Sequence, residues 1–144
     1  MYTLKQPSTN EEFKAYYHLR WKLLRKPWGQ PEGSEVDEIE NNCYHIMAID
    51  NKQLIIGIAR LQFNTEKVAQ IRYMAVVAEH ERQGVGRLMM HALEQQAKQK
   101  NIKTIILDAR EPAIGFYEKL GYRITQKTYL LFNEIQHFKM QKKL

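Results

Sequence analysis

A short turn with two glycines, residues 81–87, places the strongest constraint on how this chain can fold. The segment before it, residues 71–77, is apolar and rich in β-branched residues, which is typical of a buried strand. After the turn, apolar residues return at helical spacing, with Gln and Lys on the other face: Val85, Leu88, Met89, Ala92, Leu93 and Ala97. The sequence therefore predicts a strand, a glycine turn and an amphipathic helix in direct succession.

The turn has the features of a phosphate-binding site. Gly84 and Gly86 let a ligand approach the backbone closely because no Cβ stands in the way. The free N–H groups of the first helical turn and the helix dipole favour an anion at this point. Arg82 and Arg87 add positive charge on either side. The turn is therefore predicted to bind a phosphate group.

Three kinds of phosphate ligand compete for this turn. A P-loop requires Lys-Ser or Lys-Thr after the glycines, and neither is present. A dinucleotide fingerprint requires a third small residue where this chain has Met89, although Asp108 lies near the spacing of a ribose-binding acid. The turn also comes late in a short chain for a two-half nucleotide fold. The third candidate is the pyrophosphate of coenzyme A.

A second motif follows the turn. Residues 104–110 read as another strand, and residues 113–122 come next. The sequences Arg82-Gln83-Gly84-Val85-Gly86 and Ala113-x-x-Phe116-Tyr117-x-x-x-Gly121-Tyr122, in this order, resemble the GNAT superfamily of acetyl-CoA-dependent N-acyltransferases. The resemblance covers residues 71–122. The chain departs from the family pattern at Glu81, where Arg or Gln is usual, and at Arg110, where many relatives carry Asn.

The resemblance implies acetyl-CoA as co-substrate. In the family, pantetheine lies along the strand before the glycine turn, here beside Met74, Ala75 and Val76, and Met74 N–H would polarise the thioester carbonyl. The pyrophosphate would be held by the residues of the turn: Arg82, Gln83, Gly84, Val85, Gly86 and Arg87. No metal is expected, because no His/Cys cluster has ligand spacing.

Acyl transfer from a thioester to an amine needs a proton donor and a proton acceptor. Tyr117 is the expected general acid, because a phenol is protonated at neutral pH and the family places a tyrosine with this role at the matching position. For the general base, His137 on a late strand is one candidate, and a water chain is another route for the proton. The other candidates are Glu35, Asp37, Glu38 and His45. Cys43 as an acyl-carrying nucleophile ranks below direct transfer, since nothing local activates it.

Composition indicates one domain spanning residues 1–144, with 44% hydrophobic and 26% charged residues. No apolar run approaches a membrane span, and the first residues lack a signal-peptide pattern. The single cysteine excludes an internal disulfide, and we expect a cytoplasmic protein.

Charge is distributed unevenly along the chain. Residues 27–51 hold six acids and no Lys or Arg, which leaves 22 basic and 10 acidic residues elsewhere, a balance of +12. A basic body suits an anionic cofactor, and an acidic loop could attract a cationic amine. The same residues could equally form a simple solvated loop.

The acceptor is expected to be a small-molecule or peptide amine. Trp28 lies in a loop rich in proline and glycine, residues 27–34, and either contacts the acceptor or pins the loop to the body. Glu35 and Tyr73 are the other residues expected at the acceptor site.

The fold class expected is α/β, with a mixed, mostly antiparallel sheet of six to seven strands and about four flanking helices. Thr9 and Glu12 form a capping-box pattern that opens the first helix. Ser34 is expected to cap a short acidic helix over residues 34–41. The terminal strands could pair between subunits, so a homodimer is a further expectation.

Two other functional classes stay open. The positive charge and eight tyrosines would suit a nucleic-acid-binding domain, but no nucleic-acid motif is present and the tyrosines are scattered, so no nucleic-acid partner is expected. A cofactor-binding sensor that keeps the fold without catalysis would carry the same turn.

Overall fold

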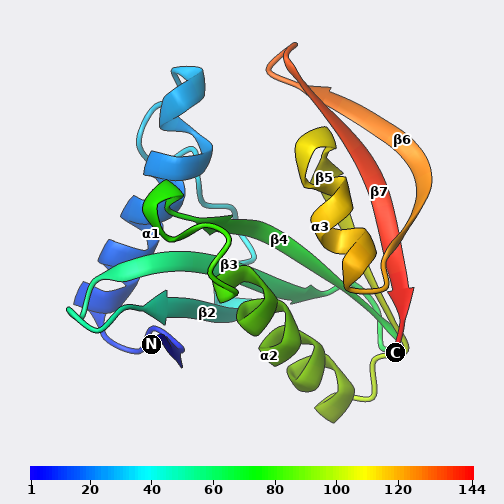
Figure 1. Ribbon diagram of the computed structural model, residues 1–144, viewed down its shortest axis with the longest axis horizontal. Coiled ribbons are helices and arrows are strands. Elements are labelled where there is room, and N and C mark those ends of the chain that lie inside the picture. Colours follow the sequence, from blue (N-terminus) through cyan, green and yellow to red (C-terminus); the bar gives the residue numbers. More distant parts are fainter. The chain divides into compact units, whose positions relative to one another are not determined.

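The computed structural model describes the whole chain, Met1–Leu144 (Figure 1). Two compact units make up the chain. The first contains Met1–Gln62 and Tyr73–Leu93, and the second contains Phe63–Arg72 and Glu94–Leu144. No helix has the length and apolarity needed to cross a membrane.

The chain forms seven strands, three α-helices and four short 3-10 turns. The strands are β1 (Thr3–Lys5), β2 (Tyr44–Ile49), β3 (Ile55–Phe63), β4 (Val68–Val76), β5 (Thr104–Arg110), β6 (Arg123–Leu131) and β7 (Ile135–Lys143). The α-helices are α1 (Asn10–Leu24), α2 (Val85–Gln99) and α3 (Ile114–Lys119). Short 3-10 turns are η1 (Lys26–Trp28), η2 (Glu40–Asn42), η3 (Ala78–His80) and η4 (Glu111–Ala113).

The strands form one seven-stranded sheet in the order β1-β2-β3-β4-β5-β7-β6. β4 and β5 pair in parallel over residues 68–71 and 104–107. A parallel pair needs a long crossover connection, which α2 supplies. The pairs β1–β2, β2–β3, β5–β7 and β6–β7 are antiparallel. The mixed, mostly antiparallel sheet predicted from the sequence is confirmed.

In the first unit, α1 packs its apolar face on the sheet. Tyr16 of α1, Met47 of β2 and Ile58 of β3 form a core whose members are at most 1% exposed. Figure 1 shows α1 running beside these two strands. The helix begins where the sequence predicts, because the Thr9 side chain accepts a hydrogen bond from Glu12 N at 3.0 Å and the Glu12 carboxylate accepts one from Thr9 N at 3.2 Å.

In the second unit, β5 alternates buried and half-buried residues, and Ile105, Leu107 and Ala109 form its buried side. Its partner β7 returns through a long hairpin from β6, drawn in orange and red in Figure 1. Tyr122 donates a hydrogen bond to Glu94 Oε2 at 2.8 Å, and Lys142 pairs with Glu94 Oε1 at 3.0 Å. These bonds satisfy a carboxylate that is 7% exposed.

The acidic helix predicted over residues 34–41 does not form, and that prediction was wrong. The segment is a series of turns ending in η2. Ser34 Oγ donates to Pro31 O instead of capping a helix, Asp37 Oδ1 accepts from Ile39 N, and Glu40 Oε2 accepts from Asp37 N. Such local side-chain bonds compete directly with helical ones.

The capping box gives a direct test of how α1 is stabilised. We expect Thr9→Ala to lower the free energy of unfolding by about 1 kcal/mol, because Glu12 N loses its acceptor at the helix N-terminus. Urea unfolding followed by circular dichroism measures the change. Thr9→Ser keeps the hydroxyl and serves as the control. Equal stability of the Ala and Ser variants would contradict the role given to the cap.

Candidate functional site

The glycine turn leads directly from β4 into α2, within the first unit. Val77 N donates to Ile56 O at 2.9 Å, which ties the end of β4 to β3. After η3 the chain turns sharply, with Arg82 at φ +62° and Gly84 at φ +84°. Nothing lies within 4 Å of the position that a Cβ on Gly84 would take, so φ alone favours glycine there. The strand, turn and helix predicted from the sequence are confirmed.

The start of α2 presents unpaired backbone donors. The first helical hydrogen bond runs from Leu88 N to Gly84 O at 3.0 Å, so the N–H groups of Val85, Gly86 and Arg87 precede the helical ladder. No acidic residue lies in the first turn of α2. The exposed side chains of Arg82 and Arg87 add positive charge beside these donors. The arrangement can bind a phosphate or another anion.

Residues from the N-terminal part of the chain form hydrogen bonds to the glycine turn. The Tyr2 hydroxyl donates a hydrogen bond to Gln83 Oε1 and lies 2.8 Å from His80 Nδ1. His80 Nε2 lies 3.7 Å from Asp50 Oδ2. A residue before β1 and the turn between β2 and β3 therefore both help to fix the glycine turn.

A buried charge cluster, defined here as Arg20, Asp37, Glu40 and Arg60, lies between α1, β3 and the loop before β2. Arg20 and Arg60 have no exposed surface, and both donate to Glu40 Oε2, at 2.7 and 2.9 Å. Arg60 also pairs with both oxygens of Asp37, at 2.8 and 3.0 Å. Burial by itself lowers the pKa of Arg60, but the bonds to Asp37 and Glu40 outweigh burial and raise it. Both guanidiniums are therefore paired with carboxylates.

Tyr73 lies in β4 directly against this cluster. Its ring centroid is 4.2 Å from the guanidinium carbon of Arg20 and 4.8 Å from that of Arg60. Its φ is +56°, which is unusual for a bulky residue inside a strand and is often a sign of a functional region. The three residues that follow, Met74, Ala75 and Val76, are half-buried at the end of β4.

The two acceptor residues expected in the loop after α1 have different surroundings. Trp28 is half-buried in η1. Glu35 is only 7% exposed, and its Oε1 accepts a hydrogen bond from Gly33 N at 2.8 Å. Arg20 Nη1 donates to the main-chain oxygen of Glu35 at 3.1 Å, so Glu35 is joined to the cluster that packs against Tyr73.

In the second unit, Tyr117 is buried on α3, with 7% of its surface exposed. Its ring packs edge-on against Phe116 and Tyr122, with centroids 5.0 and 6.0 Å away. Burial raises the pKa of the Tyr117 hydroxyl to about 12, and the positive charge of Arg110 opposes the shift. The phenol is therefore protonated at every physiological pH.

The two buried histidines differ in their free nitrogens. Both ring nitrogens of His45 have partners, Tyr16 Oη at 2.9 Å and Glu40 O at 2.8 Å, which leaves no free position for a base. His137 Nδ1 lies 3.0 Å from Ile135 O; since a carbonyl only accepts, Nδ1 carries the proton and Nε2 the lone pair. Burial lowers the pKa of His137, so the ring is neutral near pH 7. Of these two histidines, His137 is the one with a ring nitrogen that has no hydrogen-bond partner in the protein.

Cys43 has none of the features of an activated thiol. Burial raises its pKa, although Arg60 opposes the shift. Its Sγ donates to Ile39 O at 3.3 Å. A protonated, hydrogen-bonded thiol is a poor nucleophile.

The buried charge cluster is the feature that sequence reasoning missed. Two signals for it were present. Arg20 falls on the apolar face of its helix with Tyr16 and Leu24, and Arg60 interrupts an apolar strand. A charge in an apolar setting requires a partner, and the acids of residues 27–51 are the partners that such reasoning could have sought.

Comparisons with known proteins identify relatives in sequence. Residues 13–122 match the model of the Acetyltransferase (GNAT) family. The uncharacterized N-acetyltransferase YjcF of Bacillus subtilis (strain 168) is 30% identical over 132 residues, which cover 92% of this chain and 93% of that protein.

Solved structures share the fold. An acyl-CoA N-acyltransferase from Pseudomonas aeruginosa has a TM-score of 0.80 at 23% identity, covering 99% of this chain and 98% of that one. A GNAT family acetyltransferase from Elizabethkingia anophelis, solved with acetyl-CoA bound, has a TM-score of 0.77 at 18% identity, covering 99% and 98% of the two chains. At these identities the likeness concerns the fold alone.

The buried charge cluster predicts a large effect on stability. We expect Glu40→Gln to lower the free energy of unfolding by about 3–5 kcal/mol, because two buried guanidiniums lose the carboxylate that they share. Glu38→Gln makes the same change at an exposed position of the same loop and should be nearly neutral. Urea unfolding at neutral pH compares them. Similar stability of the two variants would show that Glu40 does not hold the cluster together.

Proposed function

The chain belongs to the Acetyltransferase (GNAT) family, and from that membership we propose that it transfers an acetyl group from acetyl-CoA directly to a primary amine. The family match runs through residues of both units, so we also propose that residues 1–144 act as one acyltransferase domain. The observation that carries the proposal is the start of α2, where free N–H groups meet two exposed arginines.

The residues of the turn fit the pyrophosphate of coenzyme A. Gln83, Gly84, Val85, Gly86 and Arg87 would surround it, with Arg82 adding charge on the other side of the turn. Backbone donors at a helix start bind phosphate oxygens without any particular side chain. For this reason Glu81, which departs from the usual family residue, need not prevent binding.

The last residues of β4 would hold the pantetheine arm. They follow the segment 68–71 that pairs with β5. Backbone groups of Met74, Ala75 and Val76 would bind the pantetheine amides as a further strand would. The N–H of Met74 would donate to the thioester carbonyl and stabilise the negative charge that develops on its oxygen.

The reaction forms a C–N bond as the C–S bond breaks, and it moves one proton at each end. Only the neutral form of the amine can attack the thioester. A protonated amine must therefore first lose a proton to a base or to water. The departing thiolate gains a proton. Tyr117 is the proposed donor, because burial raises the pKa of its hydroxyl and keeps it protonated.

The proposal also assigns a proton acceptor and an amine site. His137 would accept the amine proton through Nε2, because its Nδ1 is bonded to Ile135 O. Tyr73, Trp28 and Glu35 would contact the acceptor amine. Tyr73 has the closest link to the proposed reaction, since it precedes Met74 in β4.

Calorimetry tests the cofactor. We expect saturable binding of acetyl-CoA, and no comparable binding of ATP or NAD. Arg87→Gln should weaken acetyl-CoA binding about tenfold, because a charge-assisted bond to phosphate is lost. Lys98→Gln removes an equal charge in the last turn of the same helix and is the control. Equal effects of the two substitutions would contradict a phosphate site at the turn.

Kinetics with an amine acceptor tests the general acid. We expect Tyr117→Phe to lower kcat by about 100-fold or more while the Kd for acetyl-CoA stays the same, since only the proton donor is removed. Tyr44→Phe, at a half-buried position in β2, is the matched control. Wild-type kcat in Tyr117→Phe would exclude this tyrosine as the acid. Cofactor binding without transfer to any amine by the wild type would favour a sensor.

A further inference from the structure

We propose that Asp108 and Arg110 of β5 select an acceptor that carries a carboxylate beside its amine, that is, a free α-amino acid. The ammonium group of this acceptor would lie at the Asp108 carboxylate, and its carboxylate at the Arg110 guanidinium. The inference rests on the acetyl-transfer function proposed above and narrows the class of amine that the chain would take. All the residues that carry it belong to the second unit.

The register of the sheet places both charged residues beside His137. β5 and β7 are antiparallel, and Arg110 is directly opposite His137. Residues that face each other across an antiparallel pair have their side chains on the same face of the sheet. Asp108 shares that face because it is two residues before Arg110, a separation of about 7 Å along a strand. The buried apolar side chains of β5 alternate with these residues and point to the other face. A negative and a positive group therefore lie beside the proposed proton acceptor.

Neither charged side chain has a partner within the protein. Asp108 is half-buried and Arg110 is exposed, and no hydrogen bond or ion pair involves either side chain. Lys139 is directly opposite Asp108 in the register, yet the two do not form an ion pair. In the same unit, by contrast, the carboxylate of Glu94 is paired with Lys142 at 3.0 Å. A partly desolvated charge is stabilised by a partner, and an arriving zwitterion would supply one to each group.

The charge of Arg110 acts on both residues that the proposed reaction uses to move protons. Burial raises the pKa of Tyr117, and Arg110 lowers it. Burial lowers the pKa of His137; of the two charged residues of β5, Asp108 raises this pKa and Arg110 lowers it. These opposite effects agree with the register, because they require both charges to lie near the ring. An acceptor bound between the two charges would have its amine near His137 Nε2, the ring nitrogen without a partner.

Tyr129 of β6 provides apolar surface beside the two charges. Its ring stacks on that of His137, with centroids 4.5 Å apart and an angle of 15° between the planes. Because 41% of Tyr129 is exposed, the ring can contact a ligand as well as hold the imidazole in place. A carboxylate, a guanidinium and an aromatic ring suit the three parts of an α-amino acid: its ammonium group, its carboxylate and its side chain.

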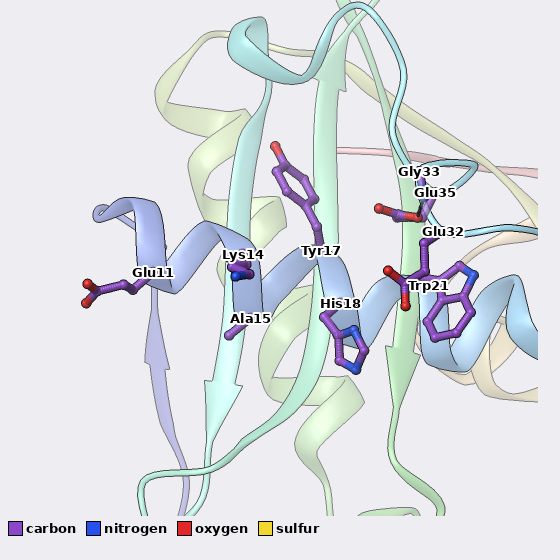
Figure 2. Close-up of a pocket in the computed structure, with 9 residues that line it drawn as sticks. All are labelled: Glu11, Lys14, Ala15, Tyr17, His18, Trp21, Glu32, Gly33 and Glu35. Carbon is purple, nitrogen blue, oxygen red and sulfur yellow. Dashed lines mark hydrogen bonds between the residues drawn. The ribbon is translucent and has the colours of Figure 1, made fainter.

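The charge of Arg110 also decides which amines are disfavoured. A guanidinium forms two parallel hydrogen bonds with a carboxylate, whereas it repels a polyamine. A lysine side chain or a peptide N-terminus has no anion next to its amine, so neither would gain from Arg110. The groove beside α1 offers no such choice, because its lining has three glutamates, one lysine and no arginine (Figure 2). Recognition of the acceptor carboxylate is therefore assigned to β5.

An NMR titration of the full chain tests the site without requiring catalysis. The ring resonances of His137 are followed as each proteinogenic α-amino acid is added, and then the α-amide of any that binds. We expect saturable shifts with at least one amino acid and about tenfold weaker binding of its amide, because the ion pair with Arg110 is lost. Arg110→Gln should bind the two equally. Arg123→Gln removes an exposed arginine of β6 and should keep the difference.

A second variant tests the other charge. Asp108→Asn should weaken binding of the amino acid about tenfold, because its ammonium group loses a counter-ion. The matching carboxylic acid without the amine should bind the variant and the wild type equally. The proposal would be overturned if no amino acid gave saturable shifts, if the wild type bound amide and amino acid equally, or if Arg110→Gln kept the preference.

Thiol release from acetyl-CoA separates this inference from the proposed function. Binding of an amino acid that depends on Arg110, without thiol release, would contradict acetyl transfer and support the amino-acid site. Thiol release with amino acids and their amides alike, at rates that Arg110→Gln leaves unchanged, would support acetyl transfer and overturn the inference. We expect thiol release with the amino acid, and a kcat/KM about tenfold lower in Arg110→Gln.

Discussion

Two fully buried guanidiniums set the arrangement of the first unit. Neither Arg20 nor Arg60 has any exposed surface, and a buried charge without a partner would cost more than a single domain can offset. The loop before β2 therefore has to supply acids from outside α1 and β3. Glu40 contacts both guanidiniums through one oxygen, and Asp37 pairs with Arg60 through two. A helix, a strand and an irregular loop are thereby bound to one another by charge.

The same cluster acts on the strand that the proposed reaction uses. The ring of Tyr73 packs on the guanidiniums of Arg20 and Arg60, and its backbone takes a left-handed conformation in the middle of β4. Cation–π contacts to two buried arginines offset the strain of that conformation. Met74 comes next in the chain, so the direction in which its N–H points depends on the residue fixed before it. Tyr73 therefore contacts the cluster that stabilises the first unit and directly precedes the residue that would bind the thioester carbonyl.

Local patterns explain which parts of the fold could be predicted. The start of α1 depends on Thr9 and Glu12, which are close in the sequence, and α2 on the spacing of its own apolar residues. In the segment 34–41, where a helix was expected, the carboxylates of Asp37 and Glu40 bind local main-chain N–H groups and also Arg20 and Arg60, which are distant in sequence. The sequence did not predict the buried charge cluster, because the partners of Asp37 and Glu40 are set by tertiary contacts. The glycine spacing revealed the turn, and the helix predicted after it implied the free N–H groups at its start.

Glu35 and Glu40 show how one loop can hold two buried glutamates with different partners. Both are less than a tenth exposed, and both lie beside Arg20. Glu40 has the guanidinium of Arg20 at 2.7 Å, whereas Glu35 gives that guanidinium only its main-chain oxygen. The same Nη1 atom of Arg20 thus donates to the carboxylate of Glu40 and to the main chain of Glu35. The position of each glutamate in the loop thus decides whether Arg20 is bound by its side chain or by its main chain.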